Sequence, residues 1–360
     1  MGTRNQIFSL VMFLLFAGSL LADTGAKHQT RLNRPIRLGT SGGNNTDITR
    51  DFCCSGTLGA VVQDRSGIHY ILSNNHVIAN TNNGRPGQPI GQPGLIDVNC
   101  RVERAKPVAE LSRFVRILFN RRNRVDAAIA RVIPGRVSRV GRILDIGKPG
   151  PPIEPRVGMR VKKSGRTSGK TVGRIIAVNT AVRVEMPDFC GDDGGRIARF
   201  VQQIVVETTN RRRFTESGDS GALIVTRKKS CPRSVGLLFA ADENGVTIGN
   251  RIQNVLSELN VSIVGCASAS VASTTLETLG TNLDPAIQKI EQIRERNEER
   301  FLRSADVAGI GIGQNEGGIG GYAIVIFAKK NLAKNSFNTI PTHIEGIPVR
   351  IFQTSGFKAR

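Results

Sequence analysis

The sequence predicts a mainly β protein with a small α+β module at its C-terminal end. Between about residues 52 and 265, short runs of Val, Ile and Leu alternate with Gly, Pro and Asn. This spacing is typical of an all-β barrel or sandwich. After this region an amphipathic helix and three strand-like runs follow. With 360 residues, the chain has room for two domains and a sizeable core.

The N-terminus has the pattern of a secretory signal peptide over residues 1–22. Arg4 precedes an apolar run at 7–21, and small residues lie near Ala22. The run is shorter than the ~20 apolar residues that span a bilayer. We therefore expect a secreted or periplasmic protein without a transmembrane span in the mature chain. The alternative is an uncleaved N-terminal membrane anchor. Residues 23–48 are polar and predict a mature N-terminal tail.

The cysteines indicate disulfides. An even number of cysteines in an exported chain favours disulfide pairing, but the sequence leaves the pairing open. No C-x-x-C pattern occurs, and the four histidines lack metal-ligand spacing. We therefore expect neither a metal site nor an organic cofactor. The six cysteines are Cys53, Cys54, Cys100, Cys190, Cys231 and Cys266.

The most informative local sequence lies at residues 216–221, Glu-Ser-Gly-Asp-Ser-Gly. Ser220 stands between glycines in a predicted tight turn ahead of an apolar strand. Gly218 allows the backbone to turn so that its own N–H and that of Ser220 point to one spot. Two such donors beside a hydroxyl predict an oxyanion hole. The alternative is an ordinary turn of Gly, Ser and Asp.

A histidine and an aspartate provide candidate partners for this serine. His76 follows the predicted strand at 69–72, where an imidazole can take a proton from a hydroxyl and return it. Asp126 lies among apolar residues, where a carboxylate needs a partner such as a His N–H. Asp97, expected to be solvated, and Asp145, expected in a connection between sheets, are competitors. His28, His69 and His343 are interpreted as structural.

The three residues occur in the order His76, Asp126, Ser220, which is the chain order of the chymotrypsin fold. Over about residues 53–265 the chain resembles trypsin-like serine peptidases of the chymotrypsin clan. It is nearer to bacterial members with an Asn-Asn-His-Val histidine motif, as in periplasmic heat-shock proteases, than to digestive trypsins. The motifs that carry this resemblance are residues 74–77, 91–97, 163–169 and 218–221.

The resemblance implies a chymotrypsin-like double β-barrel whose cleft lies between two six-stranded barrels. It implies that Ser220 is the nucleophile, that His76 is the general base and acid, and that Asp126 orients the imidazole. The N–H groups of Gly218 and Ser220 would form the oxyanion hole. The implied reaction is endopeptidase cleavage of a protein or peptide substrate through an acyl-enzyme.

Two departures from digestive trypsins bear on activation and specificity. The residue after His76 is Val77 rather than Cys, and no N-terminus is evident that could pair with Asp219. The base of the primary pocket falls on Phe214 rather than on an acid, which favours an apolar or small substrate side chain. The other pocket residues expected from the resemblance are Phe239, Ala240 and Ala241.

The charge balance leaves a second function open. The net charge is +21, and residues 101–142 hold 12 Lys and Arg against 3 Asp and Glu. Basic clusters at 121–124 and 211–213 suit an anionic surface or polymer. The alternative function is therefore a catalytically silent or latent protease-fold envelope protein that binds an anionic partner. Nucleic acid is disfavoured because aromatic residues are 5% and Trp is absent.

The remaining elements lie beyond the resemblance. Residues 266–282 are rich in Ser and Thr and predict a linker. Asp284-Pro285 predicts a helix start, and 283–302 predicts an amphipathic helix with a charged face. Strand-like runs follow at 307–312, 322–328 and 348–353. We hypothesise that this C-terminal module docks on the barrels and regulates the site or guides substrates.

Overall fold

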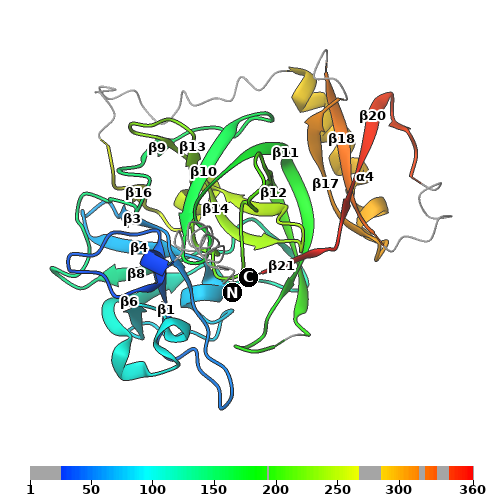
Figure 1. Ribbon diagram of the computed structural model, residues 1–360. Coiled ribbons are helices and arrows are strands. Elements are labelled where there is room, and N and C mark those ends of the chain that lie inside the picture. Colours follow the sequence, from blue (N-terminus) through cyan, green and yellow to red (C-terminus); the bar gives the residue numbers. More distant parts are fainter. Residues whose placement is uncertain (1–25, 193, 267–284, 316–320, 331–339, 360) are drawn as a thin grey trace, which may run out of the picture.

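A computed structural model describes residues 26–192, 194–266, 285–315, 321–330 and 340–359. The described chain forms two β-sheets with few helices, and each sheet curls into a barrel (Figure 1). The expected mainly β, chymotrypsin-like class is therefore confirmed. The expected signal peptide at 1–22 lies outside the described residues, as does almost all of the expected linker.

The first sheet has the strand order β16-β3-β4-β8-β6-β5-β1-β2. Its strands are β1 (Thr40–Asn44), β2 (Gly56–Leu58), β3 (Ala60–Gln63), β4 (His69–Ser73), β5 (Pro89–Gln92), β6 (Lys106–Phe114), β8 (Ala128–Val132) and β16 (Ser262–Ile263). The helices of this half are α1 (Ala26–Gln29), α2 (Asn75–Ile78), η1 (Leu95–Val98) and η2 (Val102–Arg104). The pairings are antiparallel throughout, as hairpin connections allow.

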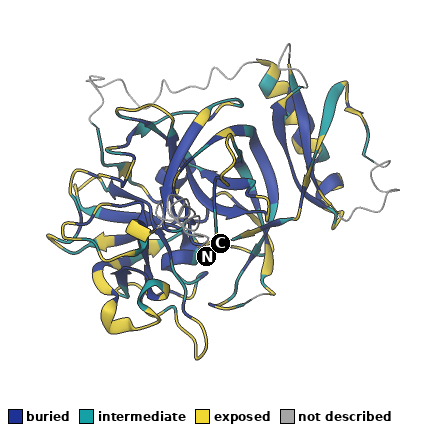
Figure 2. Cartoon of the chain, viewed as in Figure 1, coloured by how far each residue is buried: buried dark blue, intermediate teal, exposed yellow. Residues whose placement is uncertain are grey.

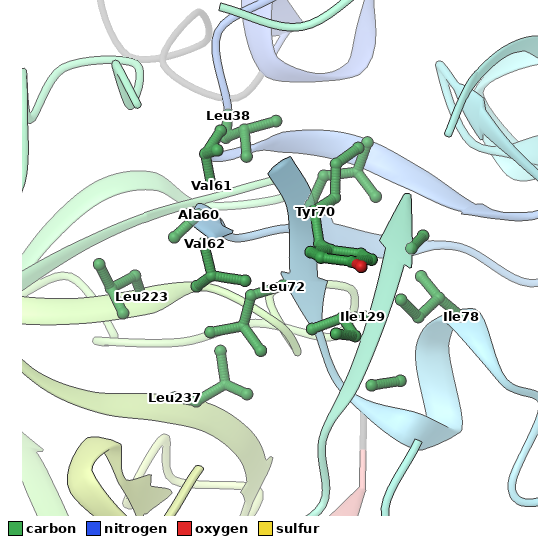
Figure 3. Packing of buried hydrophobic residues seen from close by; sticks show 14 of the residues in the cluster. Leu38, Ala60, Val61, Val62, Tyr70, Leu72, Ile78, Ile129, Leu223 and Leu237 are labelled. Atoms are coloured by element: carbon green, nitrogen blue, oxygen red, sulfur yellow. The ribbon is translucent and has the colours of Figure 1, made fainter. Parts of the chain in front are cut away.

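Apolar side chains from this sheet fill the first barrel. Leu72 and Ile129 face each other across β4 and β8 and are completely buried. Leu223 and Leu237, which belong to the second sheet, pack into the same cluster (Figure 3). The core of the first barrel therefore extends to β13 and β14 of the second sheet, beside the serine turn.

The expected polar tail at 23–48 differs from the structure. β1 is completely buried and pairs with both β2 and β5. Its sequence, Thr-Ser-Gly-Gly-Asn, gives no apolar alternation, so no strand was expected there. A Cβ atom on Gly42 would come within 2.4 Å of the Leu58 side chain, so the strand fits because its residues are small.

The second sheet has the order β19-β20-β18-β17-β11-β10-β13-β14-β15-β12-β7, with β9 and β21 attached beside it. Its barrel strands are β7 (Arg122–Asn123), β9 (Gly150–Pro152), β10 (Arg160–Gly165), β11 (Gly169–Met186), β12 (Arg196–Thr208), β13 (Leu223–Thr226), β14 (Arg233–Ala241) and β15 (Thr247–Arg251). The helix α3 (Ile252–Glu258) follows β15.

The C-terminal region continues this second sheet, because β17 pairs with β11. Its elements are α4 (Pro285–Leu302), β17 (Val307–Gln314), β18 (Tyr322–Lys329), β19 (His343–Ile344), β20 (Ile347–Thr354) and β21 (Phe357–Ala359). The helix and three of these strands fall where the sequence predicted them. Both the helix and the strands have buried segments (Figure 2), and their buried residues share a cluster with the barrel residues Val178 and Ile224.

The charged face expected on α4 is only partly in solvent. Arg294 and Glu298 are nearly completely buried and form an ion pair one helical turn apart. Glu298 also pairs with Arg199 on β12. A buried charge is tolerated when it is paired, and here the pairing tethers the helix to the barrel.

Two of the candidate disulfides form. They join Cys53 to Cys100 and Cys54 to Cys190, while Cys231 and Cys266 are free thiols. Burial, together with a hydrogen bond to Cys231, raises the pKa of the Cys266 thiol to about 11. In the described part of the chain, no helix is long and apolar enough to cross a membrane.

Candidate active site

His76 lies at the junction of β4 and α2. The chain leaves β4 at Ser73, and Asn74 occupies the N-cap position of α2. The Asn74 side chain donates to the backbone oxygen of Asp126 over 2.7 Å, and the Asn75 side chain donates to Val115 O over 2.8 Å. The two asparagines of the motif therefore fix the turn and present the imidazole.

Asp126 and His76 are brought together although 50 residues separate them. The distance from His76 Nδ1 to Asp126 Oδ2 is 2.5 Å, and the His76 backbone N–H donates to Oδ1 over 3.2 Å. Because an ionised carboxylate only accepts, Nδ1 carries the proton and Nε2 keeps a lone pair. Asn250 Oδ1 accepts from the Asp126 backbone N–H at 2.9 Å, which anchors this pair to the second barrel.

The free face of the imidazole borders a cavity. His76 Nε2 is buried and has no hydrogen-bond partner among the described residues. A cavity of about 280 Å³ is lined by His76, Asp47, Phe189, Gly218 and Ala359 together with neighbouring residues. An unpartnered basic nitrogen at such a cavity is available to take a proton.

Ser220 lies in the turn before β13, and two earlier residues of this turn, Ser217 and Gly218, line the cavity. Its side chain is buried, and its Oγ donates to Phe239 O over 3.1 Å rather than to His76. Its carbonyl accepts from Thr57 N at 2.8 Å, which joins the turn to the first barrel. Gly218 has φ +94°, and a Cβ atom there would come within 2.6 Å of Arg166. The turn therefore requires glycine at that position.

The residue before the serine, Asp219, is held by an internal lysine. The carboxylate of Asp219 accepts from Lys163 Nζ at 2.8 Å, and neither side chain is exposed. It also accepts from the side chain of Ser168 at 2.5 Å and from the backbone N–H groups of Thr167, Ser168 and Glu216. The partner that the sequence left open for Asp219 is thus Lys163.

This network favours the ionised form of Asp219. Burial alone raises the pKa of Asp219 and lowers that of Lys163, because it disfavours both charges. The attraction between the two charges opposes burial in both groups. With the additional donors on the carboxylate, the pKa of Asp219 ends below its ordinary value. The charged pair therefore keeps the serine turn fixed to β10.

A second ion pair supports the same turn. Arg166 binds Asp97 through two hydrogen bonds, with Nε to Oδ2 at 2.8 Å and Nη2 to Oδ1 at 2.6 Å. The expectation that Asp97 is solvated is wrong, since its side chain is only 7% exposed. Thr57 Oγ1 accepts from Arg166 N and donates to Gly218 O, both at 2.9 Å. The other competitor, Asp145, pairs with Lys27 and His28 rather than with His76.

The expected pocket residues lie in different places. Phe214 is completely buried in the core cluster of the second barrel, and it does not line the cavity beside His76. Phe239 is also buried and packs against Phe200 with ring centroids 4.8 Å apart. Ala240 and Ala241 follow on β14 and pair with β21. Large apolar side chains favour the interior, so the position of Phe214 six residues before Ser220 does not bring it to the cavity wall. The assignment of Phe239, Ala240 and Ala241 to the substrate pocket stays a prediction.

Sequence reasoning missed Asp47, which lines the cavity. Burial raises the pKa of Asp47 to about 6, and a positive charge on His76, when the imidazole is protonated, opposes that rise. It also missed Lys163, which lies 56 residues before its partner. The sequence did indicate that Asp219 needs a cationic partner, because no N-terminus was evident to pair with it. Asp47, in contrast, lies in a Gly/Asn-rich stretch without a recognisable motif.

The basic clusters are partly neutralised within the chain. Arg122 contacts Glu298 and Glu299, and Arg124 contacts Glu258. A larger cavity, of about 510 Å³, lies between β11 and the C-terminal strands and is lined by Arg174 and Arg350, among others. It holds none of the candidate catalytic residues.

Part of the chain is similar to a known protein family. Residues 116–263 match the family model described as the Nal1 C-terminal domain. No curated protein matches the sequence. Similar solved structures include a glutamic acid-specific serine protease that uses a histidine triad in substrate binding. It shares 18% identity and has a TM-score of 0.43, and the match covers 63% of this chain and 100% of that one.

Two further solved structures are Thermobifida fusca protease A and the Cellulomonas bogoriensis chymotrypsin. Each is 16% identical, with a TM-score of 0.42, over 64% of this chain and 99% of the other. These similar structures are trypsin- and chymotrypsin-like serine proteases.

Proposed function

We propose that the chain is an exported serine endopeptidase that cleaves peptide bonds through an acyl-enzyme. One observation carries the proposal. The imidazole of His76 is bound to Asp126 through Nδ1, while its Nε2 has no partner among the described residues and borders the cavity that also contacts Gly218. This is the arrangement that a general base for a neighbouring hydroxyl needs.

In the first half of the reaction, Ser220 Oγ attacks the carbonyl carbon of the scissile bond. The hydroxyl proton passes to His76 Nε2, and His76 then gives it to the leaving amine as the C–N bond breaks. Asp126 keeps the proton of Nδ1 in place and stabilises the imidazolium. In the second half, water gives a proton to His76 and attacks the ester carbonyl. His76 then returns the proton to Ser220 Oγ as the ester C–O bond breaks, which releases the acid and restores Ser220.

The negative charge that forms on the carbonyl oxygen needs donors in fixed positions. The N–H groups of Gly218 and Ser220 flank Asp219, and neither donates a backbone hydrogen bond to another described residue. The ion pair of Asp219 with Lys163 fixes the peptide between these two donors. The turn is thus set before substrate binds, which is the source of its catalytic value.

The serine hydroxyl must rotate before it can react, because Oγ now donates to Phe239 O. Such rotation is compatible with catalysis, since catalytic hydrogen bonds often form only in the substrate complex. The two disulfides support a site of action outside the cytoplasm, where they are stable.

Labelling with an active-serine fluorophosphonate tests the proposal. The full chain should gain one probe on Ser220 and should digest unfolded casein, whereas Ser220→Ala should do neither. His76→Ala should lose both activities although it retains the hydroxyl. If neither the folded full chain nor a variant that ends at Ser355 takes up the probe, the endopeptidase is excluded, and the binding-protein function remains.

A further inference from the structure

One edge of β14 runs past the serine turn without a partner from β13. On one side, β14 pairs with β15 as far as Ala241. On the other side, its pairing with β13 ends at Leu237, and Leu238 O then accepts from Gly221 N at 2.9 Å. Beyond this bond, Ala240 and Ala241 extend the same edge past the serine turn. Exposed strand edges of this kind bind extended peptides through main-chain hydrogen bonds.

This edge is occupied by the chain itself. β21 pairs antiparallel with β14, with Ala359 opposite Ala240 and Lys358 opposite Ala241. In Figure 1, β21 lies away from β18 and β20, beside the barrel. We propose that residues 357–359 act as an internal inhibitor, because they occupy the Ala240–Ala241 edge with which a peptide substrate would pair. This inference rests on the proposed endopeptidase function.

The direction of β21 leads its C-terminal end toward the serine turn. Because the pairing is antiparallel, the step from Lys358 to Ala359 runs from Ala241 back toward Leu238 and the serine turn. Ala359 also borders the cavity that is lined by His76 and Gly218. An extended substrate in the same register would enter the site along the same path. The segment and a substrate therefore compete for one set of backbone groups.

The contacts that hold the segment lie mostly upstream of its inhibitory end. Phe357 is 3% exposed and packs against Phe327, with ring centroids 5.8 Å apart. Thr354 Oγ1 donates to Asp242 Oδ2 over 3.0 Å, and Ser355 Oγ accepts from Glu243 N at 3.0 Å. Lys358 forms an exposed ion pair with Glu185 at 3.2 Å. These contacts keep Ala359 at a high local concentration beside the cavity.

A comparison of the full chain with a variant that ends at Ser355 tests the inference. Tethered segments reach effective concentrations in the millimolar range, so the truncation should raise kcat/KM for an extended peptide by about tenfold or more. The free peptide Gly-Phe-Lys-Ala-Arg, the sequence of 356–360, should inhibit the truncated variant competitively. Equal kcat/KM values for the two proteins would overturn the inference.

Point variants guard against a folding defect from the loss of Phe357. Ala359→Pro removes an N–H and does not fit a strand ladder, so it should raise kcat/KM while Phe357 stays in place. Lys358→Glu places like charges beside Glu185 and should raise kcat/KM to a smaller extent. Lys229→Glu, an exposed site with the same charge change, should have no effect. An unchanged rate for Ala359→Pro would contradict the inference.

The outcomes separate this inference from the proposed function. If neither the full chain nor the truncated variant is labelled on Ser220 by the fluorophosphonate, the endopeptidase proposal fails, and the internal inhibitor fails with it. If both proteins are labelled and cleave peptides at equal rates, the endopeptidase stands and only the inhibitory role of residues 357–359 is lost.

Discussion

Two buried carboxylates flank the candidate site, and their surroundings differ. Asp126 binds an imidazole whose second nitrogen has no partner among the described residues and borders a cavity. Asp219 binds the ammonium of Lys163, which also donates to Ser168 Oγ and to Gly169 O. The pair of Asp126 and His76 leaves Nε2 available for proton transfer, whereas in the pair of Asp219 and Lys163 the carboxylate is surrounded by donors.

This difference indicates that the two buried pairs have different roles, proton transfer for His76–Asp126 and positioning for Lys163–Asp219. A proton-transfer pair needs an unused acceptor at the substrate side, which His76 provides. A positioning pair gains from complete satisfaction, since any unpaired charge there would be costly. The comparison therefore predicts that losing Asp126 affects chemistry with little loss of fold, and that losing Lys163 affects both.

The largest effect in this comparison is expected for Asp126→Asn. The amide can donate to Nδ1, which then loses its proton to Nε2, so His76 can no longer act as a base. We expect kcat to fall by about 10⁴-fold with KM nearly unchanged. Steady-state kinetics on a peptide substrate measures both constants. Asp64→Asn makes the same change at a distant turn and should keep wild-type rates.

The second-largest effect is expected for Lys163→Met. Removing the ammonium leaves the Asp219 carboxylate buried without its cation, which costs about 3–5 kcal/mol of unfolding free energy. The serine turn should loosen, and kcat should fall by about 10²-fold while KM changes less. Urea unfolding and kinetics measure the two effects. Lys162→Met serves as the matched control, because Lys162 on the same strand donates to the carbonyl of Lys228.

A double variant sharpens this second prediction. In Lys163→Met with Asp219→Asn, the buried charge is gone, so part of the lost stability should return. A double variant that is as unstable as the sum of the two single variants would contradict a direct interaction between the two side chains.

The smallest effect is expected for Asp47→Asn. Burial raises the pKa of Asp47 to about 6, so folding favours its protonated form. That stabilisation is complete below about pH 4 and is lost as the pH rises through about 6. The amide cannot ionise, so the variant should be more stable than the wild type at pH 8, by about 1–2 kcal/mol after allowance for solvent screening. Thermal unfolding at pH 4.5 and pH 8 measures this, and an equal difference at both values would contradict it.

The sequence predicted the parts of the site that local patterns encode. The serine turn with Gly218, the strand exit at His76 and the apolar setting of Asp126 are visible in short stretches, and the pairing of His76 with Asp126 follows from the need to satisfy a buried carboxylate. The helix at 285–302 was likewise marked by its proline and its periodicity.

Other features depend on contacts between distant segments that carry no local signal. β1 consists of small polar residues whose burial depends on a close fit to Leu58. The pairing of Lys163 with Asp219 joins β10 to the serine turn, and β21 is a strand of three residues that is defined only by its neighbours β11 and β14. Phe214 had a plausible position in sequence but lies in the core.

Pre-steady-state hydrolysis of p-nitrophenyl acetate tests the central claim most directly, namely that His76 activates Ser220 to form an acyl-enzyme. This small ester does not need the peptide-binding edge of β14. We expect a burst of nitrophenol equal to the enzyme concentration, followed by slow turnover, and an acetyl group on Ser220 in the intact mass. Ser220→Ala and His76→Ala should show no burst. A burst of the same size in either variant, or no burst in the folded wild type, would contradict the account.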